Sequence, residues 1–286
     1  MPQLTKIIFS WDRPLQLWGL IKSALDNTDL KPEQIRVICK CSNAEYRKAY
    51  QTVSKELGCQ IIYQGNAPLW NLTLAQIQGN EFVAFSVDDM MFFRKASYSE
   101  AIEIMQNDPR ICLWSWRIGS NIRSPIKLRL YKNHWTVLHA KANRPYNYLF
   151  HTDSSLYRKK DFEYWLRLIP KQHRANFNLN RIESYLMKLP QSVRQNLGSL
   201  HAGPLKQVCL TWRINKVSGP YGSIYHEINQ TKPEYLRKVF EKGGRLDYSS
   251  LYERVDWLQK LNVNWSGFSQ VAATKESANF FTTLIQ

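Results

Sequence analysis

Strand-like and helix-like segments alternate along residues 6–105, and this alternation constrains the fold more than any other feature of the sequence. Short apolar runs predict strands over 6–10, 35–39, 59–63 and 81–87. Between them, apolar residues at helical spacing predict helices from Pro14, after Asn43 and over 69–77. Strands that alternate with helices over short connections form a parallel sheet covered on both faces. We therefore predict an α/β fold.

The predicted strands are followed by four connections, at the edge where sheets of this kind bind their ligands. The connections are 10–13, 41–43, 64–68 and 88–90. The last begins with two adjacent carboxylates, Asp88 and Asp89, and carboxylate oxygens are the ligands that Mg²⁺ and Mn²⁺ prefer. The pair predicts a metal site, with a solvated strand–loop corner as the alternative. Neither GxGxxG nor the phosphate-binding GxxxxGK[ST] motif is present.

Several short motifs within residues 6–95 occur in a familiar order. They are Gly65-Asn66, Trp70-Asn71, Glu81-Phe82-Val83-Ala84-Phe85 and Asp88-Asp89. Together they resemble the donor half of family-two glycosyltransferases of the GT-A fold, and Ser10–Pro14 is similar to the strand and loop with which those enzymes open. Trp70 stands where the family usually has Arg, and Val87 stands where it usually has the first acid of the metal motif.

The resemblance implies a GT-A-like (Rossmann-like), mixed, mainly parallel sheet with helices on both faces. It implies a nucleoside diphosphate sugar as donor, and Mn²⁺ or Mg²⁺ bound by Asp89. The implied donor-binding residues are Ser10, Trp11, Asp12, Arg13, Ser42, Asn66, Asn71, Asp88 and Ser154. His226 is the third metal ligand that the resemblance implies, with a structural histidine as the alternative.

A strongly basic stretch distinguishes the second half of the chain. Residues 109–152 contain eight Lys and Arg but no Asp or Glu, while the whole chain has a net charge of +16. Aromatic residues are interleaved with these charges, which suits sugar rings and phosphates. We predict an acceptor site or an anionic-surface site here. The predicted acceptor-binding residues are Trp116 and Arg117, within this stretch, and Tyr157, which follows it. Solvated hairpins with aromatic residues in the core are the alternative.

Two acids in the second half are candidate general bases. His151–Phe162 resembles the element that follows the donor site in many sugar transferases, and we expect Asp161 to cap a helix over 162–168. Residues 176–183 look like the family loop that leads to an acid on a helix, which makes Glu183 the candidate base and Asp153 its reserve. An inverting transfer needs a carboxylate to accept the proton of the acceptor hydroxyl. An exposed helix acid is the alternative for Glu183.

These observations predict a glycosyltransferase that moves a hexosyl or pentosyl group to a glycan or lipid-linked acceptor, with inversion or retention left open. We predict one domain, with a donor half at 1–108, an acceptor-binding and catalytic half at 109–265 and a tail at 266–286. A nucleotidyltransferase and a basic, aromatic-rich nucleic-acid-binding protein are the alternatives. No nucleic-acid-binding signature occurs, so we expect no specific nucleic-acid partner.

No apolar run approaches the roughly 20 residues that span a bilayer, and no secretory signal pattern is recognisable. The five Cys lack zinc or redox spacing, and we expect reduced thiols in a cytoplasmic protein. The basic stretch also suits peripheral docking on the inner membrane face.

Overall fold

The structure is a computed structural model, and it describes residues 3–119, 129–138, 149–170, 179–189, 192–193, 200–212, 232–253, 270–271 and 281–286. The strands are β1 (Leu4–Trp11), β2 (Ile35–Lys40), β3 (Gln60–Tyr63), β4 (Phe82–Val87), β5 (Met90–Phe92), β6 (Ile111–Ser115), β7 (Arg129–Tyr131), β8 (His134–Leu138), β9 (Ser155–Arg158), β10 (Leu200–Gly203), β11 (Cys209–Trp212) and β12 (Gln270–Val271). The α-helices are α1 (Pro14–Asn27), α2 (Ala44–Leu57), α3 (Leu69–Gln76), α4 (Tyr98–Asn107), α5 (Lys159–Arg167), α7 (Leu179–Met187), α9 (Pro233–Glu241) and α10 (Ser250–Glu253). A short 3₁₀ helix at Pro32–Gln34 leads into β2.

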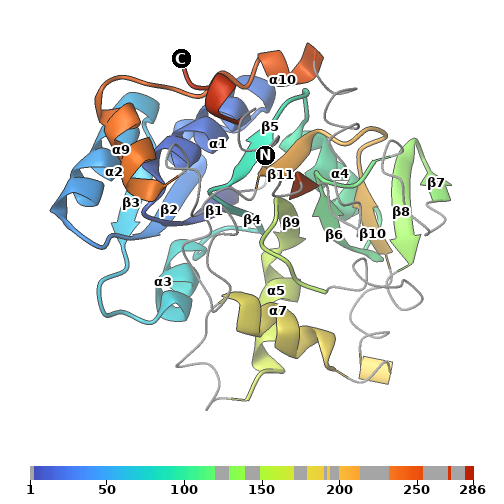
Figure 1. Cartoon of the computed structure of the whole chain (residues 1–286). Coiled ribbons are helices and arrows are strands. Elements are labelled where there is room, and N and C mark those ends of the chain that lie inside the picture. Colours follow the sequence, from blue (N-terminus) through green and yellow to red (C-terminus); the bar gives the residue numbers. More distant parts are fainter. Residues whose placement is uncertain are drawn as a thin grey trace.

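A nine-stranded sheet in the order β3-β2-β1-β4-β9-β6-β10-β8-β7 forms the centre of the molecule (Figure 1). Strands β3, β2, β1 and β4 are parallel to one another, and β6 is parallel to β10. Strand β9 is antiparallel to both of its neighbours, β4 and β6. The predicted mixed, mainly parallel sheet is therefore confirmed. A second sheet, β12-β11-β5, includes a strand that the sequence did not predict, because Met90–Phe92 is only three residues long.

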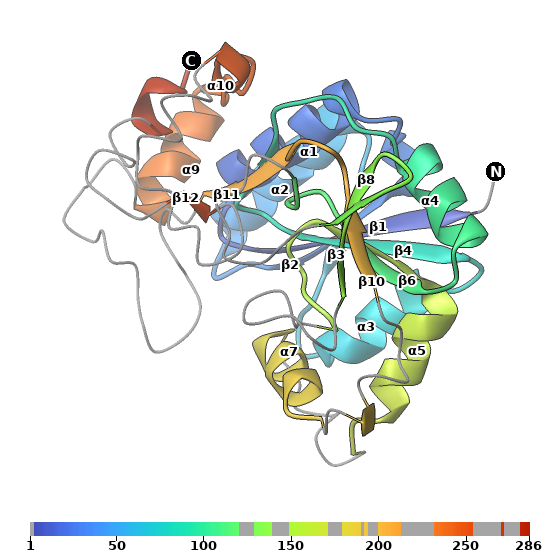
Figure 2. The same ribbon diagram turned by 90° about the vertical axis from the view of Figure 1, so that its right-hand side faces the viewer.

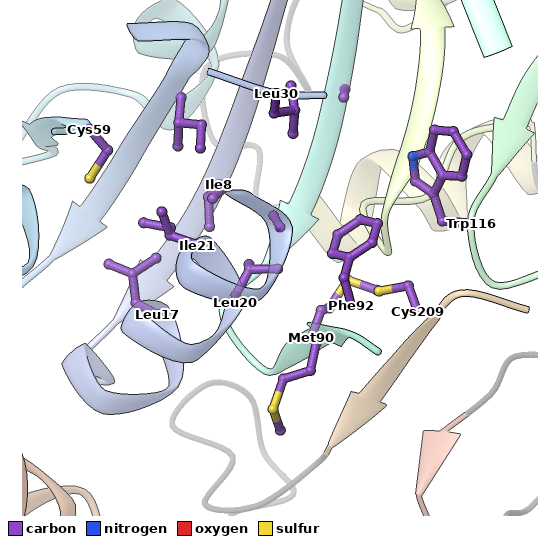
Figure 3. Packing of buried hydrophobic residues seen from close by; sticks show 14 of the residues in the cluster. Ile8, Leu17, Leu20, Ile21, Leu30, Cys59, Met90, Phe92, Trp116 and Cys209 are labelled. Atoms are coloured by element: carbon purple, nitrogen blue, oxygen red, sulfur yellow. The ribbon is translucent and has the colours of Figure 1, made fainter. Parts of the chain in front are cut away.

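Helices lie on both faces of the large sheet, as Figures 1 and 2 show, and each face has its own hydrophobic core. On one face, residues of α1, α2, α4 and α9 pack against β1 and β2; Figure 3 shows part of this cluster, with Leu17, Leu20 and Ile21 of α1 near Ile8 of β1. On the other face, residues of α5 and α7 pack against Ile7, Val83 and Phe85. This two-faced burial follows from the largely apolar composition of the central strands.

Local signals place most helix ends correctly. Asn43 caps α2 by accepting from the Tyr46 backbone N–H, and Gly58 ends this helix with a φ of 70°. The prediction for Asp161 was wrong: α5 begins at Lys159, and Asp161 lies inside its first turn. Its carboxylate accepts instead from the Arg158 guanidinium at 3.0 Å. An acid in the first turn still interacts favourably with the helix dipole.

Arg158, the last residue of β9, ties the end of α4 to the sheet. Its guanidinium donates to the carbonyl oxygens of Met105, Asp108 and Ile111, the last at 2.7 Å. Its side chain is 10% exposed. A cation at this position satisfies carbonyl groups at the carboxyl end of a helix and opposes the negative end of its dipole.

We expect Arg158→Ala to lower the free energy of unfolding by about 2–3 kcal/mol, because it leaves buried carbonyl groups without their charged donor. Urea denaturation measures this change. The exposed neighbour Lys160 is the matched control, and Lys160→Ala should stay within about 0.5 kcal/mol of wild type. Equal stability of the two variants would contradict the role given to Arg158.

Within the described residues, no helix combines the length and the apolar character needed to cross a membrane.

Candidate active site

The strand directions bring several predicted residues to one edge of the large sheet. Strands β1, β2, β4 and β6 end at this edge, and the antiparallel strand β9 begins there. Phe85, near the end of β4, is paired with Ser155, the first residue of β9. Residues that follow β4 and residues that precede β9 therefore lie near one another, although a long stretch of chain separates them.

Asp88 is the centre of a buried polar cluster at the ends of β1 and β4. Its Oδ1 accepts from the Arg13 guanidinium at 2.8 Å, and its Oδ2 accepts from Ser10 Oγ at 2.7 Å and from the Trp11 backbone N–H at 3.2 Å. Asp89 Oδ2 lies 3.3 Å from the same guanidinium. The Asp88 carboxylate is only 4% exposed, so its contacts within the protein fix the loop after β1 against the end of β4.

Tyr50 of α2 contacts two residues of this cluster and was not predicted as a site residue. Its hydroxyl group lies 2.5 Å from Ser10 Oγ and accepts from the Arg13 backbone N–H at 3.1 Å. Burial raises the pKa of Tyr50 well above its ordinary value, so the phenol is neutral. Tyr50 occupies a regular position in the apolar stripe of its helix, so the sequence marks it only as a core residue.

Asp12 links the loops that follow β1 and β2. It adopts a φ of 53°, and its carboxylate accepts from the Ser42 backbone N–H at 2.9 Å and from the Ser42 hydroxyl group. Trp11 lies over this link, with Lys40 Nζ at 4.2 Å from the centroid of its ring. The partly exposed indole ring and the adjacent polar loop form a surface on which a planar ring can stack.

Arg117 and two acids form a second cluster, at the ends of β6 and the start of β9. Arg117 is fully buried and its guanidinium pairs with Asp153. Glu183 of α7 is near this pair, and its Oε1 accepts from the Thr152 backbone N–H at 2.8 Å and from the Thr152 hydroxyl group at 3.2 Å. The structure therefore brings both predicted base candidates together.

The electrostatics of the second cluster favour a proton on Glu183. Burial, followed by the charge of Asp153, raises the pKa of Glu183 to about 8. Two neighbouring carboxyl groups do not ionise independently, because each charge opposes the other. Burial also lowers the pKa of the nearby His151 to about 3, which keeps this imidazole neutral at physiological pH. Its Nδ1 lies 2.7 Å from Ser155 Oγ.

The other predicted residues lie in different surroundings. Asn66 and Asn71 are exposed, after β3 and on α3 respectively. Trp116 packs edge-to-face against Tyr98, with ring centroids 4.9 Å apart, and the Tyr157 hydroxyl group hydrogen-bonds the backbone of His151. Trp116 and Tyr157 are both buried in the core, so their side chains present no surface to an acceptor in this conformation. His226 lies outside the described residues.

Two serine side chains join the clusters. Ser86 Oγ of β4 lies 3.0 Å from Ser154 Oγ, immediately before β9, and both residues are fully buried. Ser154 is the predicted donor-binding residue next to Asp153, and Ser86 comes two residues before Asp88. The distance between these hydroxyl groups shows that the Asp88 cluster and the Asp153 cluster belong to one region of the sheet edge.

The two acids of the Asp88 cluster differ in how well they suit a divalent cation. Both oxygens of Asp88 accept hydrogen bonds from the protein, and Asp89, which also lies beside the Arg13 guanidinium, has the more exposed side chain of the two, at 12% against 4%, so it is the more accessible acid for a cation. Mg²⁺ is typically held by one or two carboxylates together with water and substrate phosphates. Among the described residues, no group of three or more His, Cys, Asp or Glu is arranged to hold a metal by itself. One carboxylate thus fits a cation that arrives with a phosphorylated ligand.

Comparison with solved structures finds proteins of similar architecture at low sequence identity. The chain is similar to the mannosyltransferase PcManGT from Pyrobaculum calidifontis, solved with GDP-Man and Mn²⁺, at 14% identity and a TM-score of 0.43 over 73% of this chain. It is also similar to S. aureus TarS, at 13% identity and a TM-score of 0.47 over 72% of this chain. The matches cover 56% and 36% of those two chains, respectively. No known protein family and no curated protein matches the sequence.

Proposed function

We propose that this protein transfers a sugar from a nucleoside diphosphate sugar to a hydroxyl group of a glycan or lipid-linked acceptor. The observation that supports the proposal best is the meeting of two clusters at one sheet edge. One cluster contains Arg13, Asp88 and Asp89, which suits a metal-bound diphosphate. The other contains Asp153 and Glu183, which suits the abstraction of a proton. The link of 3.0 Å between Ser86 and Ser154 brings the two together.

In this proposal the first cluster binds the donor. The ring of Trp11 stacks on the nucleobase, and the linked loops of Asp12 and Ser42 hold the ribose through their backbone and hydroxyl groups. Asp89 would hold Mn²⁺ or Mg²⁺, which supplies charge neutralisation for the leaving diphosphate. Asp88 has a supporting task, because it orients the Arg13 guanidinium rather than touching the donor.

The second cluster serves the acceptor in the same proposal. Glu183 accepts the proton of the acceptor hydroxyl group as that oxygen attacks the anomeric carbon, while the bond from this carbon to the diphosphate oxygen breaks. The negative charge of Asp153 makes Glu183 a stronger base. This arrangement belongs to an inverting transfer, and the anomeric configuration of the product, read by NMR, checks it.

Some cations of the basic stretch are paired with acids, and others are exposed to solvent. Arg117 is paired with Asp153, and Arg110 is paired with Asp108 at 2.8 Å. Arg129 and Lys132 are exposed on the hairpin of β7 and β8. We propose that these exposed cations attract an anionic acceptor or the anionic surface on which a lipid-linked acceptor lies.

Titration with UDP-, GDP-, CDP- and dTDP-sugars, followed by the thermal unfolding temperature, tests the donor site. A ligand that binds only the folded state raises this temperature by mass action. We expect one nucleotide to raise it in the presence of Mn²⁺, and Asp89→Ala to lose most of this rise. Glu103→Ala is the matched control, since this exposed acid lies on α4.

The same titration with nucleoside triphosphates, and a binding assay with unrelated DNA or RNA, separate the alternatives. A rise with nucleoside triphosphates alone would favour nucleotidyl transfer. No rise with any nucleotide sugar, together with strongly salt-dependent binding to unrelated DNA or RNA, would contradict the proposal and favour nucleic-acid binding.

A further inference from the structure

Lys6 is a charged residue in the middle of a buried strand. Its relative exposure is 0%, and its Nζ donates to Ser86 Oγ at 2.7 Å and to the Tyr98 hydroxyl group at 2.9 Å. The same Nζ lies 5.3 Å from the centroid of the Phe92 ring. Burial lowers the pKa of Lys6 to about 7. Because a buried ammonium group is unfavourable compared with an apolar side chain of similar volume, stability alone does not explain a lysine at this position.

The hydrogen bonds of Lys6 lead toward the candidate active site. Ser86 Oγ, which accepts from Lys6, lies 3.0 Å from Ser154 Oγ. Cys209 Sγ approaches the same Ser154 hydroxyl group at 3.5 Å. Cys209 is paired with Phe92 across β11 and β5, and Figure 3 shows the two side chains beside each other. Lys6 therefore forms the inner end of a buried polar chain that reaches the residue after Asp153.

Ser154 has an unusual backbone conformation that its surroundings must maintain. Its φ is 48°, in the left-handed region that side chains other than glycine rarely adopt. Its carbonyl oxygen accepts from the Trp116 backbone N–H at 3.2 Å, and its N–H donates to the Thr152 carbonyl oxygen at 3.1 Å. Strained conformations of this kind persist where neighbouring groups over-determine them, and they set the direction of adjacent side chains. Here the adjacent side chain is Asp153.

We infer that Lys6 is a positioning residue for the transfer reaction, which acts through Ser86 to hold Ser154 in its left-handed conformation and so keeps Asp153 beside Arg117 and Glu183. The inference rests on the proposed function, because that proposal assigns Glu183 and Asp153 their chemical tasks. Lys6 touches neither substrate nor reacting atoms. Its amino group is retained for the hydrogen bonds that set the geometry of the site, at the expense of core stability.

Three variants test the inference by activity. Lys6→Met and Ser86→Ala should each lower kcat roughly 10- to 100-fold, since small displacements of catalytic groups have effects of this size. The donor KM should stay within about twofold, and the unfolding temperature of Lys6→Met should equal or exceed that of wild type. Tyr98→Phe is the matched control, because it removes the other partner of Lys6 and keeps the bond to Ser86; it should change kcat less than about threefold. Wild-type kcat in both Lys6→Met and Ser86→Ala would overturn the inference.

A second readout requires no sugar donor. The titration of the Glu183 carboxyl carbon, followed by ¹³C NMR, reports how close Asp153 lies, because the charge of Asp153 raises the pKa of Glu183. If Asp153 loses its position, this pKa should fall in both Lys6→Met and Ser86→Ala. Loss of the positive charge alone would instead raise the pKa in Lys6→Met and leave it unchanged in Ser86→Ala.

The two readouts separate the inference from the proposed function. A fall of the Glu183 pKa in both variants supports the positioning role even if wild type transfers no sugar, in which case only the proposed function fails. An unchanged or raised pKa in both variants overturns the positioning role, whatever the activity shows.

Discussion

Replacing Arg13 by Met should lower the free energy of unfolding by about 3–5 kcal/mol, because removal of one partner leaves a buried charge uncompensated. Arg13 lies 2.8 Å from Asp88 and 3.3 Å from Asp89, and its side chain is only 8% exposed. The neighbouring carboxylates raise the pKa of Arg13 against the opposing effect of burial. Methionine keeps much of the side-chain volume, so the loss reports the charge. Urea denaturation measures the change.

The surface pair of Lys22 and Asp26 gives the matched control for this variant. Their atoms approach to 2.6 Å, but both side chains are about 40% exposed. Lys22→Met should therefore change the free energy of unfolding by no more than about 0.5 kcal/mol. Asp88→Leu added to Arg13→Met should recover part of the lost stability, because it removes the unpaired acid. A single Arg13→Met variant within about 1 kcal/mol of wild type would contradict the assignment of this cluster as a buried charge network.

Glu183→Gln should lower kcat by about 10²- to 10⁴-fold, which is the usual contribution of a general base. Glutamine keeps the hydrogen bond from Thr152 and the approximate volume, so the donor KM and the fold should remain. In wild type, kcat should rise as the pH increases toward about 8, because Glu183 must lose its proton before it can act as a base. Glu103→Gln, on the exposed face of α4, should keep both the activity and its pH profile. Wild-type kcat in Glu183→Gln would exclude Glu183 as the base.

The same variant has a predicted effect on stability. The pKa of Glu183 is raised from 4.5 to about 8, so between these values the folded protein retains a proton that the unfolded chain has released. The free energy of unfolding of wild type therefore falls as the pH rises through this interval. Glu183→Gln lacks this contribution and should lose less stability over the same range. Urea denaturation at several pH values gives the comparison, and parallel profiles for the two proteins would contradict the buried, protonated state of Glu183.

The sequence was sufficient to predict the parallel part of the sheet, because its strands are largely apolar and the helices that follow β1 and β2 have regular apolar stripes. It also predicted the edge at which Arg13, Asp88 and Asp89 gather, since parallel strands end together. It did not predict β5 or the start of α5. Each depends on a few residues whose structure is decided by tertiary pairing rather than by local pattern.

The relations within the site were harder to predict from sequence. Asp88 and Asp89 are adjacent and chemically identical in the sequence, yet Asp88 is held by Ser10, Trp11 and Arg13 while Asp89 borders the guanidinium on one side. Such differences arise from backbone geometry at the strand end. Lys6 did carry a signal, as a charge within an apolar strand, but its partners lie 80 and 92 positions away along the chain.

The antiparallel strand β9 has a consequence for the order in which this chain can assemble. Strands β3, β2, β1 and β4 all come from residues before Asp88, so they can pair while the ribosome is still making the rest of the chain. Until Ser155–Arg158 is made, one side of β4 has no partner strand. An unpaired strand edge of this kind can pair with strands of other chains. When β9 pairs with β4, it covers this exposed edge and places Asp153 near the carboxyl end of β4. The pairing of β9 with β4 and β6 thus joins the two parts of the sheet and, in the same step, brings Asp153 to the edge that holds Arg13 and Asp88.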